Sequence, residues 1–343
     1  MIRALFQDKR FLVGFIFVFG LFVASIVYEF VKEYLNVRQG LLYDDHMNLL
    51  GAAPFPPSWM FPLGTDSRGY DMLYKGIEGA KYTIGFALIV AFLRLLLSSG
   101  VGVFRAMFTK PLPSKPSNVL DSFQYLPMAL LCYFILKPVV YINPRFGVLE
   151  TLVFETVIIT LVAVPTVSVL IANEIEVILQ REFIVSARTL GSGKFHILLK
   201  HVRPHVWPRL MIIFVQQVIQ VLLILLHLGL FTLFLGGTLR ERTLTDWVYY
   251  SSTNDWASVF GFHYSEVNLF PWIPLSMVLF FGVTLVFLNF MLEGMKDVFS
   301  GRQEVPAVRK KRRRRDKERA VGDASVALGD EAFTAVNRND FSV

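Results

Sequence analysis

The sequence predicts an all-α membrane protein, and two observations carry that prediction. The 343-residue chain is 54% hydrophobic and has a mean hydropathy of +0.51, whereas soluble domains are about 45–50% apolar. The apolar residues also gather into six blocks long enough to cross a bilayer as helices, which takes about 20 residues each. These blocks lie near 11–31, 83–103, 119–140, 149–171, 211–235 and 272–292.

The first block predicts a retained anchor rather than a cleaved signal peptide. A signal peptide has an apolar core of about 7–15 residues, and block 11–31 is longer and lacks a clean small-x-small cleavage site after it. Cys132 is the only cysteine, so no disulfide forms within the chain. We expect four parts: an N-terminal anchor helix in 1–31, a loop over 32–82, a transmembrane core over 83–292 and a tail over 293–343.

The distribution of Lys and Arg predicts the orientation in the membrane. If the N-terminus is cytoplasmic, the inner segments before residue 292 hold 12 Lys and Arg, the outer segments hold 8, and 12 more follow residue 292. Basic residues near span ends favour the cytoplasmic side. We therefore expect a multi-pass cell-membrane protein with both termini in the cytoplasm and with loop 32–82 extracytoplasmic.

A cytoplasmic segment over 174–204 has the pattern of two short amphipathic helices joined at Gly191-Ser192-Gly193. Glycine suits a helix end and a tight turn. Two apolar stripes with helical spacing flank the glycines: Leu179, Phe183, Ala187 and Leu190 before them, and Phe195, Leu198, Leu199 and Val202 after them. An ordinary connecting loop remains an open alternative.

The same segment contains "GSGK", which does not match a nucleotide-binding loop. Such a loop requires G-x-x-x-x-G-K-[ST], because the glycines wrap the phosphates and the hydroxyl holds magnesium. Here Lys194 is followed by Phe195, and Arg188 occupies the place of the first glycine. We therefore expect no ATP and no other cofactor in this chain.

The fifth block carries a polar stripe. Gln216, Gln220 and His227 fall on one helical face, and polar side chains inside a membrane usually face protein or water. A stripe that lines a transport pathway and a stripe that forms interhelical hydrogen bonds both remain open. Arg94 and Lys137 lie within blocks and are expected to extend their charges to the membrane interfaces.

Other candidate features receive simpler interpretations. His201 and His205 share a helix face near His196, but no carboxylate or cysteine of suitable spacing joins them, so we expect basic surface residues and no metal site. Trp247 and Trp256 are expected in the interfacial aromatic belt, and contact with an extracytoplasmic partner protein is the alternative.

The tail contains a basic run that could contact anionic lipid, with each basic residue contributing about 1 kcal/mol near the surface. A simple positive-inside anchor is the alternative, and nucleic-acid binding is not expected of a run tethered beside a span. The run consists of Arg309, Lys310, Lys311, Arg312, Arg313, Arg314 and Arg315.

Five stretches resemble the dipeptide/oligopeptide/nickel permease family of ABC importers, in the expected order and spacing from about residue 8 to 302. The closest likeness is to the second, C-type permease. The first stretch is "EFIVSARTLGSGKFHILLKHVRPHVWPRL". The others are "FPLGTDSRGYDMLYKGIEGAKYTI" from Phe61 to Ile84, Asp121 and Pro127 in "DSFQYLP", "LFLGG" from Leu233 to Gly237, and "NFMLEGMKD" from Asn289 to Asp297.

The chain departs from the family pattern at several positions. Val185 and Ser186 stand where the family has Glu and Ala, so an acidic residue that could pair with an ATPase is missing. Tyr70 replaces an arginine and Glu293 replaces an aspartate. The chain also continues about 40 residues past the usual end.

The resemblance implies a type I ABC importer permease fold of six transmembrane helices with a cytoplasmic coupling helix. The chain would be a permease subunit for peptide import and not an enzyme, with ATP and magnesium bound on partner chains. Its implied partners are a second homologous permease, two ABC ATPase subunits and an extracytoplasmic substrate-binding protein, besides membrane lipids. Import of nickel or another metal chelate, and a non-transporting scaffold or sensor, are the alternatives. The implied coupling residues are Glu182, Ala187, Arg188, Gly191, Ser192, Gly193, Lys194 and Phe195.

Overall fold

A computed structural model describes most of the chain and divides it into two units, Met1–Gly294 and Met295–Val343. The described residues are 2–34, 39–43, 49–108, 126–142, 147–242, 247–251 and 253–300. Of the second unit, only the end of the last helix is described. Everything below concerns the first unit, except that this helix is given its full length.

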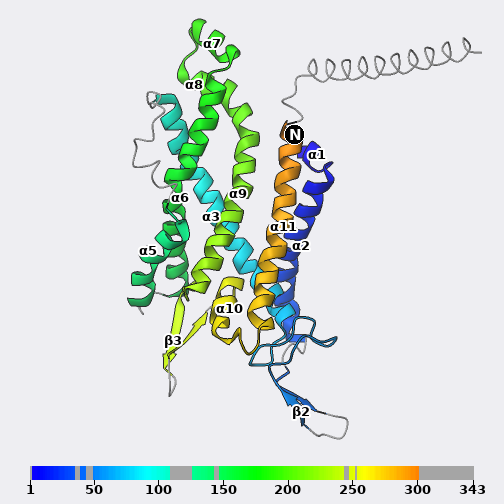
Figure 1. Ribbon diagram of the computed structural model, residues 1–343. Coiled ribbons are helices and arrows are strands. Elements are labelled where there is room, and N and C mark those ends of the chain that lie inside the picture. Colours follow the sequence, from blue (N-terminus) through cyan, green and yellow to red (C-terminus); the bar gives the residue numbers. More distant parts are fainter. Residues whose placement is uncertain are drawn as a thin grey trace, which may run out of the picture. The chain divides into compact units, whose positions relative to one another are not determined.

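Five helices in the described residues are long and apolar enough to span a membrane, which confirms the prediction of an all-α membrane protein. Figure 1 shows them. They are α2 (Lys9–Val31), α3 (Met72–Phe108), α6 (Val148–Leu179), the continuous stretch Lys194–Leu230 that ends in α9 (Arg203–Leu230), and α11 (Trp272–Ser300).

The third predicted span is only partly described. Helix α5 (Met128–Ile142) is apolar and 15 residues long, and it covers the second half of the predicted block 119–140. The first half of that block, with Asp121, lies outside the described residues. Helix α3 begins at Met72, whereas the predicted block begins at 83. The charged residues Lys75 and Lys81 lower the hydropathy of the first turns, so hydropathy did not indicate them, but these residues do not prevent a helix.

The described residues also form shorter elements. They are α1 (Ile2–Leu5), the 3₁₀ turn η1 (Lys32–Tyr34), α7 (Glu182–Thr189), α8 (Lys194–His196), η3 (Ile197–Val202), α10 (Trp256–Phe262) and η4 (Tyr264–Glu266). Two antiparallel hairpins pair β1 (Leu41–Tyr43) with β2 (Leu49–Ala52) and β3 (Thr238–Arg242) with β4 (Trp247–Ser251). Helices α7 and α8 lie at one end of the long helices, which we call the elbow end, and the hairpins lie at the other, the hairpin end (Figure 1).

Helix α3 is central to the packing and contacts α2, α6 and α9. Its buried stripe includes Ala80, Ile84, Ala87 and Ala91, which recur at helical spacing. Small side chains let helices approach closely, which is how transmembrane helices gain packing energy in a lipid solvent that is as apolar as they are. Helix α2 packs against α11 through Phe17 and Phe287, whose ring centroids lie 3.9 Å apart.

Trp256 corrects one expectation. The sequence placed this residue in the interfacial belt, but it is fully buried at the start of α10. Its indole Nε1 donates to Gly76 O of α3 at 2.6 Å, and its ring packs against Phe280 and Phe281 of α11. A buried tryptophan needs such an acceptor, and this one joins α10 to two spans. The side chain of Trp247 lies outside the description.

Candidate functional site

The polypeptide breaks its helix between α6 and α7. Helix α6 ends at Leu179, and Arg181 adopts an extended backbone (φ −71°, ψ 144°) before α7 begins. The break changes the helical phase, so the predicted stripe is only half right. Leu179 and Ala187 are buried as expected, whereas Phe183 and Leu190 are exposed, Leu190 by 85%.

A glycine elbow ends α7 in the pattern called a Schellman motif. The N–H of Ser192 donates to Ala187 O and the N–H of Gly191 donates to Arg188 O, each at 3.0 Å. Gly191 has φ +84°, which the motif requires and L side chains resist. A Cβ at Gly191 would meet nothing within 4 Å, so the requirement is one of backbone conformation alone. Gly193 has φ −68° and N-caps α8, a conformation open to any residue.

The second stripe is shifted by a π-helical turn. Residues Ile197–Val202 form η3 with π-helical geometry, in which backbone hydrogen bonds join residues five apart. The predicted Val202 is buried and the predicted Leu198 is half-buried, but Ile197 is buried in place of Phe195, and the predicted Phe195 and Leu199 are exposed by 69% and 60%.

The elbow rests on a hydrophobic core at the ends of three long helices. Ile184 of α7 and Ile197 and Val202 of η3 are buried in one cluster. The other members come from α3, α6 and α9 and include Met107, Ile171, Ile175, Ile178, Val206 and Ile213. A force applied to the elbow is therefore transmitted to all three helices, because close-packed cores deform little.

The surface of the elbow combines apolar and cationic side chains. Val185, Leu190, Phe195 and Leu199 are exposed beside the exposed Arg188 and Lys194, and Lys194 Nζ lies 5.2 Å from the centroid of the Phe108 ring. A groove of about 390 Å³ adjoins them, lined by Leu199, Arg203, Pro204 and Trp207. Exposed apolar side chains gathered on one short segment are typical of an interaction site. Of the implied coupling residues, Ala187 alone is buried and Ser192 is half-buried.

The histidines near the elbow form an aromatic group. The ring of Phe183 stacks on His205 at 5.3 Å and lies 6.3 Å from His201, which in turn lies 5.9 Å from His196. Nδ1 of His205 contacts His201 O at 2.8 Å. Among the described residues, no group of three His, Cys, Asp or Glu side chains is arranged to hold a metal.

Arg94 contradicts the expectation that it reaches an interface. Its side chain is fully buried (0% exposed) in the middle of α3. Nε and Nη2 donate to Ile159 O of α6 at 3.1 and 2.8 Å, and Nη1 donates to Gln217 Oε1 of α9 at 3.3 Å. Arg94 therefore ties three spans together. Sequence reasoning missed Gln217, since its pairing with a residue 123 positions away leaves no local pattern.

The predicted polar stripe on α9 lies on the outside of this subunit. Gln220 and His227 are exposed and Gln216 is half-buried, and His227 Nδ1 contacts Leu223 O in its own helix at 2.5 Å. The neighbouring Gln217 is the one that makes an interhelical bond. Lys137, exposed on α5, lies 2.6 Å from the hydroxyl of Tyr133.

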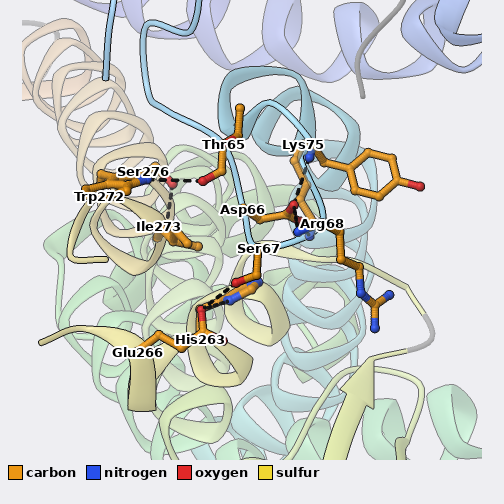
Figure 2. A network of polar contacts seen from close by, with 11 residues as sticks. Thr65, Asp66, Ser67, Arg68, Lys75, His263, Glu266, Trp272, Ile273 and Ser276 are labelled. Carbon is orange, nitrogen blue, oxygen red and sulfur yellow. Dashed lines mark hydrogen bonds and ion pairs between the residues drawn. The ribbon is translucent and has the colours of Figure 1, made fainter. Parts of the chain in front are cut away.

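A polar cap closes the hairpin end. We define it as residues 53–75 with α10, η4 and the first turn of α11, and Figure 2 shows its network. Asp66 is buried and accepts from the N–H groups of Arg68 and Tyr70 at 2.9 Å and from Lys75 Nζ at 2.8 Å. Burial raises the pKa of Asp66, but Lys75 and the two N–H groups outweigh burial, so the pKa lies below its usual value.

The cap joins segments far apart in the sequence. Glu266 accepts from Ser67 Oγ at 3.2 Å and pairs with His263 Nδ1 at 2.9 Å (Figure 2). The bond from His263 holds the pKa of Glu266 below its usual value. Trp272 Nε1 donates to Thr65 O at 3.2 Å. Gly64 has φ +75°, and a Cβ there would lie 2.5 Å from Trp272 Cδ1, which explains the glycine in "FPLGTD".

The basic run Arg309–Arg315 lies outside the described residues, as does Asp121.

These features define a class of protein, an all-α membrane protein with five membrane-length helices among its described residues and an apolar and cationic elbow at one end. The chain belongs to the family of binding-protein-dependent transport system inner membrane components, whose family model matches residues 98–305. This confirms the predicted membrane subunit of an ABC importer in a cell membrane. Proteins of this family are the membrane subunits of transporters.

Relatives with curated names agree with that family. The peptide transport system permease protein SapC of Haemophilus influenzae is 25% identical over 210 residues, covering 59% of this chain and 65% of that protein, slightly under two thirds. A putative peptide permease protein of Brucella abortus is 27% identical over 256 residues, covering 73% and 76%. The oligopeptide transport system permease protein OppC of H. influenzae is 21% identical over 305 residues, covering 86% and 88%.

Proposed function

We propose that this chain is a permease subunit of an ATP-driven peptide importer that moves its helices through the glycine elbow. The observation that carries the proposal is the elbow itself, an exposed apolar and cationic surface seated on the joined ends of α3, α6 and α9. A partner that binds this surface and changes shape would move the three helices together, which is the rigid-body switching known for alternating access.

The energy source in this proposal lies on other chains. Two ABC ATPase subunits bind ATP and magnesium in the cytoplasm, and one of them receives Glu182, Arg188, Gly191, Gly193, Lys194 and Phe195. The absence of a nucleotide-binding motif at Lys194 supports this division, because the residue after it lacks the hydroxyl that magnesium requires. Both termini lie in the cytoplasm, as the basic residues favour.

The transport pathway in this proposal forms with a second permease. Gln220 and His227 are exposed and Gln216 is half-buried, so a second subunit placed against α9 would enclose them in a polar pathway. The names of the SapC and OppC relatives support a peptide as the substrate. An extracytoplasmic binding protein would deliver it, and the tail run Arg309–Arg315 would contact anionic lipid.

A membrane scaffold or sensor is the second candidate function. Val185 and Ser186 favour it, because both side chains are exposed on α7 where the family resemblance expects a Glu-Ala pair. An ATPase surface suited to glutamate would meet Val185 here. The ATPase would then lose one of the contacts that couple ATP hydrolysis to the permease.

Uptake by a reconstituted complex separates these functions. The chain would be purified with its second permease and ATPases, placed in proteoliposomes, and supplied with the binding protein and labelled mixed peptides. Accumulation of peptide with matching stimulation of ATP hydrolysis is the expected result. Accumulation of a nickel chelate alone would favour the metal-chelate alternative, and an assembled complex that accumulates neither would favour the scaffold.

A further inference from the structure

The polar cap presents two apolar side chains with no role in its own packing. Trp59 is fully exposed (105%) and Met60 is 64% exposed. They occupy the middle of a four-residue tip, Ser58–Phe61. The surrounding stretch from Gly51 to Gly64 contains no charged residue, so the tip is an uncharged apolar projection. Leaving an indole in water is unfavourable, which raises the question of what covers it.

The tip is held rigidly. The N–H of Ser58 donates to Phe61 O at 2.9 Å, and the N–H of Phe61 donates to Ser58 Oγ at 3.2 Å. Pro56 and Pro57 restrict the backbone on the preceding side. The base is closed by Phe55, which stacks on Phe61 with ring centroids 5.8 Å apart. Trp59 and Met60 are therefore displayed on a preformed loop.

The base of the tip is connected to the spans. Thr65 is fully buried, accepts from the N–H of Phe55 at 2.8 Å through its Oγ1, and donates its own N–H to Phe55 O at 3.0 Å. Its carbonyl accepts from Trp272 at the start of α11. The next residue, Asp66, is paired with Lys75 of α3. A load on the tip therefore reaches α3 and α11 through buried polar contacts.

We propose that Trp59 and Met60 are the anchor by which this permease holds its extracytoplasmic substrate-binding protein, and that they enter an uncharged apolar pocket on that protein. The inference rests on the proposed function for the side of the membrane and the partner. An exposed tryptophan on a preformed loop is typical of the residues that dominate interface affinity, and rigidity before binding lowers the entropy lost on association.

The alternative occupant is the lipid interface, and rigidity argues against it. A fluid interface accepts a tryptophan in many orientations, so it gains little from a loop held by reciprocal hydrogen bonds. A protein pocket has one shape, so it binds a loop more tightly when the loop already has a fixed conformation.

The test measures affinity of the purified binding protein for the complete transporter in nanodiscs. Trp59→Ala is expected to raise Kd about tenfold or more, as for a hot-spot residue, and Trp59→Phe to recover part of the loss. The matched control is Leu269→Ala, which truncates another exposed apolar side chain at the same end and is expected to change Kd less than about twofold. ATP hydrolysis without binding protein is expected to be the same in all variants.

The outcomes separate the tip from the proposed function. If the wild-type transporter binds the protein and Trp59→Ala binds it equally well, the tip assignment is wrong and the proposed function stands. If the wild type neither binds nor responds to the binding protein, the proposed function fails and the tip assignment with it. Nanodiscs with brominated lipid test the other occupant. If brominated lipid quenches tryptophan fluorescence in the wild type and this quenching is missing in Trp59→Phe, Trp59 lies in lipid and the proposal is overturned.

Discussion

Gly191 and Gly193 flank one serine but carry different requirements. Gly191 alone has a positive φ, and it does so to complete two hydrogen bonds that end α7. For an L-residue that conformation costs about 1–2 kcal/mol, and more for a β-branched one. Gly193 has an ordinary extended backbone and open space around its Cα.

Gly191→Val should therefore impair coupling while leaving the protein inserted. The strained elbow would shift the exposed Leu190 and Phe195, and we expect binding of the ATPases, and ATP-driven uptake, to fall by about tenfold, the equivalent of about 1.4 kcal/mol. Pull-down of the ATPases and uptake in proteoliposomes measure this, with membrane content checked by immunoblot.

Gly193→Ala is the matched control and should retain near-normal uptake. Lys194→Ala should also be mild, because an exposed charge contributes little. Loss of nucleotide binding by the isolated chain in Lys194→Ala, together with normal uptake in Gly191→Val, would contradict the elbow assignment and return attention to a phosphate site.

At this scale the sequence predicts where the elbow lies but not which side chains it buries. Glycine is a local signal for a helix end, and Gly191 fulfils it. The phase of the flanking helices depends on the extended backbone of Arg181 and on the π-helical turn from Ile197, which are set by packing against α3, α6 and α9. That packing exchanges Phe183 for Ile184 and Phe195 for Ile197 in the core.

Among the helices, Arg94 joins α3 to α6 and α9 through hydrogen bonds. Arg94→Ala would leave the buried Gln217 without its partner and open a void, and an unsatisfied buried group costs about 1–3 kcal/mol. We expect a lower unfolding temperature than for the wild type. Leu96→Ala, which truncates an exposed side chain on the same helix, should change little.

The single buried cysteine provides the measurement. Cys132 is fully buried in the folded protein, so a thiol-reactive dye reports unfolding with no engineered label. Equal unfolding temperatures for Arg94→Ala and Leu96→Ala would show that the guanidinium contributes nothing to the packing of α3, α6 and α9.

We expect the polar cap to make the protein less stable in acid. The pKa of Glu266 in the folded state lies below its usual 4.5 because His263 donates to it, so the carboxylate stabilises the fold fully above pH 4.5. That contribution is lost as the pH falls through the lower, folded pKa. The wild type should lose more stability between pH 5 and pH 3 than Glu266→Gln, which cannot ionise, when unfolding is followed at each pH. Parallel profiles would rule out this role for Glu266.

The helices themselves were predictable where hydropathy alone decides. Blocks of about 20 apolar residues must be helical in lipid, because every backbone N–H needs a partner there, and in the described residues five of the six predicted blocks fall on such helices. What joins the helices was not predictable. Arg94 meets Ile159 and Gln217 across 65 and 123 positions, and Trp256 reaches Gly76 across 180.

Topology is testable on the whole molecule. Ser58→Cys and Ser192→Cys place thiols at the two ends of the bundle, and Cys132 is buried and gives little background. Because basic residues favour the inner side, an impermeant maleimide added to intact cells should label Ser58→Cys only, and Ser192→Cys should require permeabilisation. The reverse pattern would overturn both the orientation and the partners assigned to each end.

The tail can be removed to test its role. Truncation after Arg302 deletes the basic run, and if that run only contacts lipid, uptake should be largely retained. Binding of a tail peptide to anionic liposomes should weaken as salt is raised. Complete loss of uptake with normal membrane content would show that the tail takes part in transport.

The exposed elbow also bears on how the complex is made in the cell. Under the proposed function, a permease synthesised ahead of its ATPases would expose Leu190 and Phe195 to the cytoplasm, and exposed apolar side chains are what chaperones and ATP-dependent proteases recognise. Docking of an ATPase would cover them. The proposed coupling surface would thus mark an unassembled subunit for degradation, and the supply of ATPases would set how many permeases survive.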